Sequence, residues 1–190
     1  MGSEMCIRDR PHSINLDFLE KIFRNKLEIV VDPELETNVA KSYEIVQKSA
    51  DGDLPVYGVN TGFGKLANKI IPSEDREQLQ KNLVLSHCAG IGEPLPEDVT
   101  RLMMVLKIVS LSLGASGVKW STIKQIERII NSGIIPEIPH QGSVGASGDL
   151  APLAHMAAVM IGEGFAFYNG KKLSGLEALK RVGIEPITLG

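Results

Sequence analysis

A run of small residues between Gly142 and Pro152 is the segment of this chain whose composition most needs a chemical explanation. It reads Gly-Ser-Val-Gly-Ala-Ser-Gly-Asp-Leu-Ala-Pro. One interpretation is structural: the glycines permit unusual backbone angles, Asp149 caps the next helix and Pro152 lies in its first turn. The other interpretation is a catalytic loop. Spacing alone favours the structural one, because short motifs often occur by chance.

Three familiar catalytic loops do not fit this segment. A hydrolase nucleophile elbow needs Gly-x-Ser-x-Gly, but Gly148 follows Ser147 directly. A phosphate-binding loop needs Gly-Lys followed by serine or threonine, and the chain contains no such run. A dinucleotide site needs Gly-x-Gly-x-x-Gly after a strand, and neither glycine-rich stretch has this spacing. Hydrolase, nucleotide-binding and dinucleotide-binding functions are therefore disfavoured.

Two further stretches carry side chains that could take part in chemistry. Residues 56–64 read Val-Tyr-Gly-Val-Asn-Thr-Gly-Phe-Gly, where glycines and an asparagine interrupt a strand-like start and predict a shaped loop. Ser73 is a candidate N-cap for a helix in which Leu79, Leu83 and His87 share one face. Taken alone, Tyr57 is typical of a core tyrosine, and His87 of a helix-terminal partner of carbonyl groups.

The elements that must position these residues are mostly helices. Asp32 and Pro33 predict a helix start, Asn131-Ser132-Gly133 predicts a helix end, and Asn169-Gly170 predicts a β-hairpin between residues 165–168 and 171–173. We expect residues 134–148 to be loop. The other expected helices cover 16–23, 73–87, a segment after Asp98 that buries Leu102, Val105, Leu106 and Val109, and the ranges 116–130 and 150–161. The predicted fold class is mainly α with small β elements.

Composition excludes several classes of protein. The chain has 190 residues, 20 basic and 23 acidic side chains and a net charge of -3, without the basic stripe that nucleic acids require. No apolar run approaches the ~20 residues of a membrane span, so a soluble protein is expected. The two cysteines, Cys6 and Cys88, suggest neither a disulfide framework nor a metal site, and we interpret them as reduced cytosolic thiols.

Both ends of the chain stand apart from this pattern. Residues 1–13 lack the apolar core of a secretion signal, and we interpret them as an unstructured tail or an artefact outside the fold. Residues 14–190 form the expected domain. Because the chain stops at Thr188-Leu189-Gly190 without a polar tail or cap, we expect it to be cut in mid-domain.

Three blocks together resemble the aromatic amino-acid ammonia-lyases. They are residues 142–155, Gly-Ser-Val-Gly-Ala-Ser-Gly-Asp-Leu-Ala-Pro-Leu-Ala-His; residues 57–64, Tyr-Gly-Val-Asn-Thr-Gly-Phe-Gly; and residues 82–87, Asn-Leu-Val-Leu-Ser-His. The first block is long enough to be highly specific. The resemblance runs from about residue 14 to residue 190, and it implies the electrophile-bearing N-terminal part of the longer fumarase/aspartase-like helical lyase fold.

The resemblance implies that the protein makes its own cofactor. In this family, an Ala-Ser-Gly tripeptide cyclises to a methylidene-imidazolone, which here means Ala146, Ser147 and Gly148; no external cofactor is implied. Gly148 lacks a Cβ, so its nitrogen can approach the Ala146 carbonyl, and Ser147 becomes the exocyclic methylene. A carboxylate at Asp149 could assist ring formation. A second tripeptide, Ala115-Ser116-Gly117, lacks the glycine-rich approach, and we interpret it as a helix-helix turn.

The resemblance also assigns two side chains to the substrate. Tyr57 matches the tyrosine that removes a β-proton, and His87 matches a position that contacts the substrate side chain. Histidine at that position suits a polar ring such as imidazole or phenol better than phenyl. We interpret His155 as a structural residue or as one that supports the site without touching the substrate, and His140 and His12 as surface or loop residues.

The expected function is elimination of ammonia from L-histidine to give urocanate, in a cytoplasmic homotetramer without nucleic-acid, membrane or metal partners. Blocks 142–155 and 161–164, together with Ser86-His87, favour the members of the family that act on histidine. Lyases or aminomutases acting on tyrosine or phenylalanine share the electrophile and remain the alternative. Two other interpretations are a catalytically silent fragment of such an enzyme and a helical binding module whose small-residue loop only caps a helix.

Overall fold

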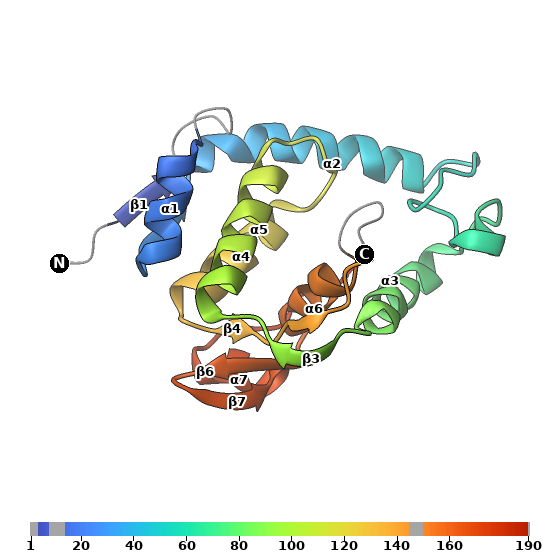
Figure 1. The fold of residues 1–190 in the computed structure, drawn as a ribbon. Helices are drawn as coiled ribbons and strands as arrows, with labels where there is room; N and C mark the ends of the chain where they lie inside the picture. The colour runs from blue at the N-terminus through green and yellow to red at the C-terminus, as the bar shows by residue number, and fades with distance from the viewer. Residues whose placement is uncertain (1–3, 8–13, 145–149, 190) are drawn as a thin grey trace.

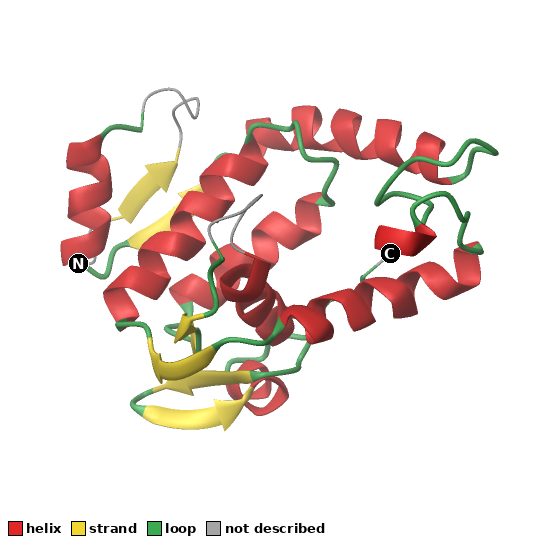
Figure 2. Ribbon diagram, turned by 45° about the vertical axis from the view of Figure 1, so that its right-hand side comes forward, coloured by secondary structure: helices red, strands yellow, loops and turns green. Residues whose placement is uncertain are grey.

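The computed structural model describes residues 4–7, 14–144 and 150–189. Helices dominate, and short strands connect them at two sides of the molecule (Figures 1 and 2). The α-helices are α1 (Leu16–Arg24), α2 (Glu36–Ala50), α3 (Ser73–His87), α4 (Glu97–Ser112), α5 (Trp120–Asn131), α6 (Leu150–Met160) and α7 (Gly175–Arg181). The strands are β1 (Glu4–Ile7), β2 (Glu28–Val31), β3 (Ile91–Pro94), β4 (Ile135–Pro136), β5 (Pro139–Gln141), β6 (Phe165–Tyr168) and β7 (Lys171–Ser174). Two 3-10 helices cover Pro33–Leu35 and Gly64–Leu66.

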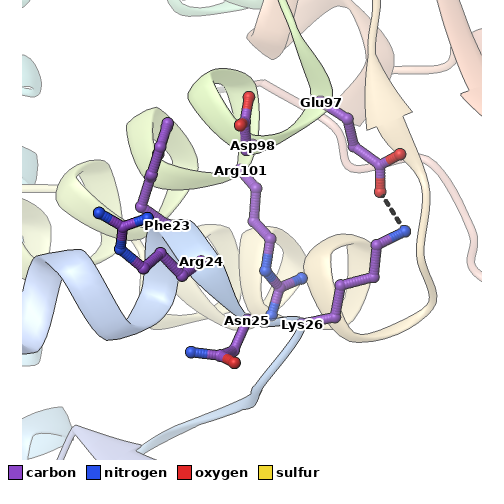
Figure 3. A pocket seen from close by; sticks show the side chains of 7 residues that line it. All are labelled: Phe23, Arg24, Asn25, Lys26, Glu97, Asp98 and Arg101. Carbon is purple, nitrogen blue, oxygen red and sulfur yellow. Dashed lines mark ion pairs between the residues drawn. The ribbon is translucent and has the colours of Figure 1, made fainter.

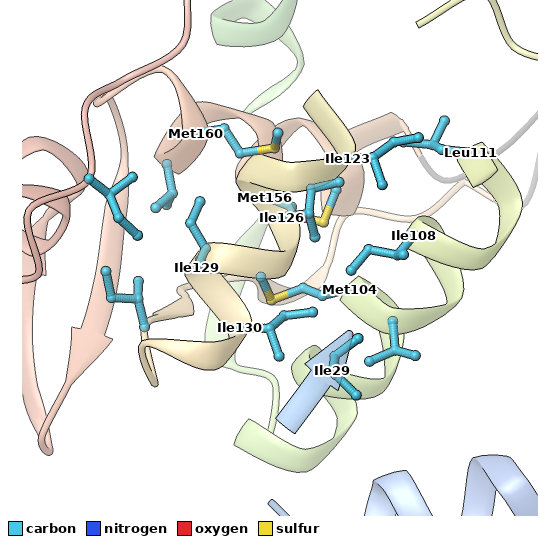
Figure 4. Close-up of a cluster of buried hydrophobic side chains, with 14 of the residues drawn as sticks. Ile29, Met104, Ile108, Leu111, Ile123, Ile126, Ile129, Ile130, Met156 and Met160 are labelled. Carbon is cyan, nitrogen blue, oxygen red and sulfur yellow. The ribbon is translucent and has the colours of Figure 1, made fainter. Parts of the chain in front are cut away.

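The core lies where α4 and α5 pack side by side against β2, as Figure 4 shows. Its largest fully buried side chains include Ile29, Met104, Ile108, Ile126 and Ile130. Burying such aliphatic side chains stabilises the fold by about 1.5–3 kcal/mol each. Helix α2 crosses this α4–α5 pair and contacts both helices (Figure 1).

The edge of β2 that faces α5 is paired by side chains instead of by another strand. Asn131 Oδ1 accepts from the Ile29 amide at 2.9 Å, and Asn131 Nδ2 donates to the Ile29 carbonyl at 2.7 Å. Glu127 Oε1 accepts from the Val31 amide at 3.0 Å. Because Glu127 and Asn131 are one helical turn apart, one face of α5 satisfies this strand edge.

Local signals correctly predicted several element boundaries. Asp32 Oδ1 accepts from the Glu34 amide at 2.9 Å, with Pro33 at the first position of the 3-10 helix that leads into α2. The hairpin β6–β7 turns at Asn169 and Gly170, both with positive φ (51° and 73°), as a tight primed turn requires. The mainly helical fold class is confirmed.

The buried face of α4 differs from the prediction. Val105 is buried as expected, but Leu106 is 42% exposed, and Met104, Ile108 and Leu111 are the other buried apolar residues. Leu102 and Val109 are only partly buried and pack at the edge of the core. The reason is that α4 carries apolar side chains on nearly all of its faces, so the periodicity of the sequence does not single out one buried face. Its contacts with α1 and α5 determine which residues are buried.

The predicted starts of α3 and α5 also need correction. Pro72, and not Ser73, is the N-cap of α3, and Ser73 Oγ bonds instead to the Glu74 carboxylate. The helix expected from residue 116 begins at Trp120. Gly117 has φ +67° and donates its amide to Ser42 Oγ at 2.9 Å, so it belongs to the turn.

The second Ala-Ser-Gly tripeptide is thus a helix-helix turn, as predicted. A Cβ on Gly117 would lie 2.3 Å from Val46 Cγ2, and one on Gly114 would lie 2.9 Å from the Asn38 carbonyl carbon. Glycine is therefore required at both positions because the turn presses directly onto α2.

Two segments expected to lack regular structure contain strands. Residues 4–7 form β1, which pairs in parallel with β2, because the outer edge of β2 offers unpaired backbone groups. Residues 134–148 include β4 and β5: β4 pairs with β6, and β5 pairs with β3. These strands form by pairing with segments that are distant in the sequence, and local composition does not predict such pairing.

Candidate active site

Tyr57 and His87, which lie thirty positions apart in the sequence, line one cavity of about 500 Å³. Its walls are otherwise apolar and come from the loop before α3, from α3 and from α6: Phe63, Leu83, Val84, Leu150, Leu153, Ala154 and Ala157. Helices α3 and α6 pack together along this wall (Figure 1). An apolar cavity with a phenol and an imidazole is suited to a small aromatic molecule with a polar ring.

Asn60 positions the loop that carries Tyr57. Its side chain is fully buried: Oδ1 accepts from the Val56 amide at 2.7 Å, and Nδ2 lies 2.9 Å from the Leu54 carbonyl and 3.2 Å from the carbonyls of Ser49 and Gly52. The loop is thereby held on the end of α2. The strand-like start expected at Val56 is not a strand: Val56 leads into a turn over residues 57–60, and its carbonyl accepts from the amides of Val59 and Asn60.

Two further contacts shape the same loop. Thr61 Oγ1 accepts from the Gly58 amide at 3.3 Å, and the Asn60 carbonyl accepts from the Ile71 amide at 2.8 Å. The Tyr57 ring packs edge-on against Phe63, with centroids 5.7 Å apart. The Tyr57 ring is therefore held by its loop, although it remains 64% exposed in this chain.

His87 is the last residue of α3, and its ring is oriented by its own helix. Nδ1 lies 2.8 Å from the Leu83 carbonyl oxygen, which can only accept, so Nδ1 carries the proton in this contact. In the neutral ring, Nε2 is then the acceptor, and it has no hydrogen-bond partner among residues 4–7, 14–144 and 150–189.

The tripeptide Ala146-Ser147-Gly148 and Asp149 lie outside the described residues. Their described neighbours are Val144, which is exposed, and Leu150, which begins α6 and lines the cavity. The roles predicted for these four residues, and the helix cap predicted at Asp149, therefore stay predictions. The flanking residues fit an electrophile formed there, because the segment joins directly to the cavity wall at Leu150.

His155 lies one turn beyond Ala151 on α6 and accepts a hydrogen bond from the Gly90 amide through Nε2 at 3.1 Å. Burial lowers the pKa of His155, and the charge of Glu137 partly opposes this shift. The neutral ring can accept, so His155 joins α6 to the segment between α3 and β3. Neither its partner Gly90 nor the anchoring role of Asn60 was predicted, since only the glycine-rich context hinted at them.

A larger cavity of about 630 Å³ lies between the end of α1 and the start of α4 (Figure 3). Lys26 pairs with Glu97 at 2.6 Å. Arg101 donates to the carbonyls of Leu27 and Ile130, and burial lowers the pKa of its guanidinium. These groups join α4 to the start of β2 and to the end of α5, so we assign this cavity no chemistry.

The described residues contain neither a membrane-spanning helix nor a cluster of metal-binding side chains. None of their helices has the length and apolar character needed to cross a membrane. They also hold no group of three or more histidine, cysteine, aspartate or glutamate side chains that could bind a metal ion.

Comparison with known proteins defines the class to which this fold and site belong. A family model described as aromatic amino acid lyase matches residues 14–190. The chain belongs to the aromatic amino acid lyase family.

Individual members of this family and related solved structures are similar to the chain over nearly its whole length. The chain is 51% identical to a histidine ammonia-lyase of Bradyrhizobium diazoefficiens over 181 residues, which are 95% of this chain and 35% of that protein. It resembles the crystal structure of histidine ammonia-lyase from Trypanosoma cruzi with a TM-score of 0.88 and 34% identity, over 98% of this chain and 36% of the other. It also resembles the phenylalanine aminomutase of Pantoea agglomerans, with a TM-score of 0.88 and 32% identity over 100% and 36% of the two chains. The chain thus spans about a third of the length of these relatives.

Proposed function

We propose that the complete protein carrying this chain eliminates ammonia from L-histidine and releases urocanate. The observation that carries this proposal is the shared cavity of Tyr57 and His87, which α6 lines from Leu150 onward, two residues after the tripeptide. The 51% identity to a histidine ammonia-lyase supports histidine as the substrate. In this reaction, the Cα–N bond and one Cβ–H bond break, and a carbon-carbon double bond forms.

A methylidene-imidazolone formed from Ala146, Ser147 and Gly148 would supply the electrophile that draws electron density from the substrate. The side chains of the cavity then have separate tasks. Tyr57 Oη takes the β-proton, for which it must lie within hydrogen-bond reach of that carbon. The apolar walls keep water from the reacting atoms.

His87 selects the ring of the substrate. Its Nδ1 is bonded to the Leu83 carbonyl, so Nε2 can accept a hydrogen bond from an imidazole N–H. A phenyl ring offers no such donor and would leave the ring nitrogen unpaired, which costs binding free energy. The cavity therefore favours histidine over phenylalanine.

We assign activity to the complete protein and not to these 190 residues alone. Tyr57 is 64% exposed here, whereas a general base works best when it is held in a partly dry site. Family resemblance further supports a homotetramer, and the scarcity of cysteine supports a cytoplasmic location.

A tyrosine or phenylalanine lyase or aminomutase is the second candidate. The phenylalanine aminomutase of Pantoea agglomerans and the histidine ammonia-lyase of Trypanosoma cruzi match this fold with the same TM-score of 0.88. The fold therefore does not separate these activities. A tyrosine phenol could also donate to His87 Nε2, so phenol substrates belong in the test.

The deciding experiment uses the complete natural protein with histidine, tyrosine and phenylalanine supplied separately. Ultraviolet absorbance follows the unsaturated acid, and mass spectrometry identifies any β-amino acid formed by amine migration. We expect urocanate from histidine and much slower turnover of the other two substrates. Faster turnover of tyrosine or phenylalanine, or a β-amino acid product, would replace the proposal by the second candidate.

A further inference from the structure

We infer that Arg76 positions Tyr57 for its reaction by fastening both ends of the loop that carries it. The Tyr57 loop, defined here as residues 51–72, connects the end of α2 to the start of α3 (Figure 1). This inference deepens the proposed function and rests on it, since it names a residue that places the group accepting the β-proton. Arg76 is a positioning residue, because it acts on Tyr57 through the backbone of the loop.

The guanidinium of Arg76 contacts both ends of the Tyr57 loop. Its Nη1 lies 3.3 Å from Asp51 Oδ1, and its Nε donates to the Ile71 carbonyl at 3.4 Å. Asp51 directly follows α2, and Ile71 lies just before α3. A guanidinium presents its donors in a fixed planar fork, so it can bond to two acceptors at once. One side chain of α3 thus holds the two ends of the loop together.

A continuous series of hydrogen bonds leads from Arg76 to the backbone next to Tyr57. The Ile71 carbonyl accepts from Arg76, and the Ile71 amide donates to the Asn60 carbonyl at 2.8 Å. The Asn60 side chain accepts in turn from the amide of Val56, the residue before Tyr57, at 2.7 Å. A displacement of Ile71 therefore moves the backbone that carries the Tyr57 ring.

The second half of the Tyr57 loop runs back beside its first half. Thr61 and Ile70 form an antiparallel bridge, and the Gly62 amide donates to the Lys69 carbonyl at 3.3 Å. Because the two halves are bonded to each other, the loop is held as one unit when its ends are held. Arg76 fastens this unit to α3, the helix that also carries His87. The relative position of Tyr57 and His87 in their shared cavity thus depends on Arg76.

A separate cavity of about 360 Å³ lies between the Tyr57 loop and the two helices that it connects. Gly58 and Val59, which follow Tyr57 directly, line this cavity together with Arg76 and Gln80 of α3 and Ala50 of α2. Close packing of side chains is what usually fixes a segment in place. Because this space is not filled by packed side chains, polar contacts such as those of Arg76 must hold the loop on this side.

The Arg76–Asp51 ion pair should affect the position of Tyr57 more than the stability of the fold. The side chain of Arg76 is 19% exposed, but that of Asp51 is 73% exposed, and ion pairs that face solvent contribute little to stability. Misplacing a catalytic group by about 1 Å can nevertheless slow a reaction by about 100-fold. Substitution of Arg76 should therefore reduce turnover in a protein that still folds.

The experiment compares the complete natural protein with its Arg76→Gln variant, using L-histidine and L-histidine deuterated at Cβ. We expect Arg76→Gln to lower kcat on the order of tenfold and to change KM much less, because His87 is untouched. The deuterium isotope effect on kcat should rise, because removal of the β-proton becomes the slower step. Arg76→Lys keeps the charge but loses the planar fork, so it should recover part of the lost kcat.

Asp51→Asn tests the same contact from its exposed side, where a substitution does not disturb the core. It should lower kcat in the same direction as Arg76→Gln. Because both substitutions remove one shared contact, the variant that carries both should have the kcat of Arg76→Gln within about twofold. Losses of kcat that multiply in the double variant would contradict a shared contact.

Arg181→Gln is the matched control, because it removes an arginine ion pair of similar length, that of Arg181 with Glu177 at 3.0 Å on α7. It should keep the kcat and the isotope effect of the wild type. If Arg76→Gln also keeps both, or if Arg181→Gln changes them equally, the inference is wrong.

Amide hydrogen exchange of residues 54–71 follows the Tyr57 loop without any turnover. Exchange should be faster in Arg76→Gln than in Arg181→Gln, and equal exchange would overturn the role of Arg76 in holding the loop. A wild-type protein that forms no urocanate, while these exchange rates differ as expected, would instead overturn the proposed function and support the fastening of the loop by Arg76.

Discussion

The rings of Tyr57 and Phe63 meet edge-on, with centroids 5.7 Å apart and planes at 77°. This arrangement is the favoured geometry of an aromatic pair and contributes about 0.5–1.5 kcal/mol beyond the area buried. Both rings line the cavity that His87 also lines. Phe63 therefore orients the Tyr57 ring through a contact that does not involve the Tyr57 hydroxyl. The position of the ring and the chemistry of its hydroxyl can thus be tested independently.

Tyr57→Phe should remove the chemistry and keep the position. The aromatic contact with Phe63 remains, but the group that accepts the β-proton is lost, so kcat should fall by roughly 10²- to 10⁴-fold. Steady-state kinetics of the complete protein measure this. The thermal midpoint should stay as in the wild type, and so should the loss of two waters in mass that a cyclised Ala146-Ser147-Gly148 peptide would show. Retention of near-wild-type kcat would show that another group is the base.

Asn60→Ala should unfold the loop that carries Tyr57. The substitution leaves the Val56 amide and the carbonyls around it without partners, which should lower the free energy of unfolding by about 2–4 kcal/mol. Denaturant unfolding and limited proteolysis of residues 52–62 measure the effect. Asn82→Ala is the matched control, because Asn82 is exposed on α3 and should change stability by no more than about 0.5 kcal/mol. Equal effects of the two substitutions would contradict the anchoring role of Asn60.

His87→Phe should change which substrate is preferred. The imidazole acceptor is replaced by an apolar ring, so the ratio of kcat/KM for phenylalanine to that for histidine should rise on the order of 100-fold. His87→Gln keeps a polar acceptor and should retain the preference for histidine. An unchanged ratio in His87→Phe would mean that residues outside this chain choose the substrate.

Stability should decrease as pH falls below neutrality because of His155. Burial holds its folded-state pKa below the ordinary value of about 6.5, and Glu137 is the charged group that opposes this shift. In the unfolded chain, the His155 ring takes up a proton as pH falls through about 6.5, whereas in the folded chain it stays neutral until a lower pH. The free energy of unfolding therefore decreases as pH falls between these two values.

Thermal melts at about pH 7.5 and about pH 5.5 test this linkage, since the two values bracket the unfolded-state pKa. The thermal midpoint of the wild type should drop more between them than that of His155→Gln, which cannot titrate at this position. Equal drops would assign the acid sensitivity to other groups. Because an imidazolium cannot accept from the Gly90 amide, acid should also break the hydrogen bond that joins α6 to Gly90.

Turns and helix starts that depend only on neighbouring residues could be predicted from the sequence. Asp32 with Pro33 and Asn169 with Gly170 each act over two to four residues, and the structure confirms both. The turn predicted at Ala115-Ser116-Gly117 is also confirmed, with a positive φ at Gly117. The family resemblance likewise rests on continuous blocks and is confirmed by the match over residues 14–190. The mainly helical fold followed from the same local periodicities.

Tertiary structure alone decided which surfaces meet. It chose the buried face of α4, joined Asn131 to Ile29 across 102 positions, and brought Gly90 within reach of His155 across 65. It also placed Tyr57 and His87 in one cavity. The physical reason is that hydrogen bonds within a turn or cap are settled by the residues that make it, whereas a packed face or a shared cavity depends on the simultaneous fit of distant segments.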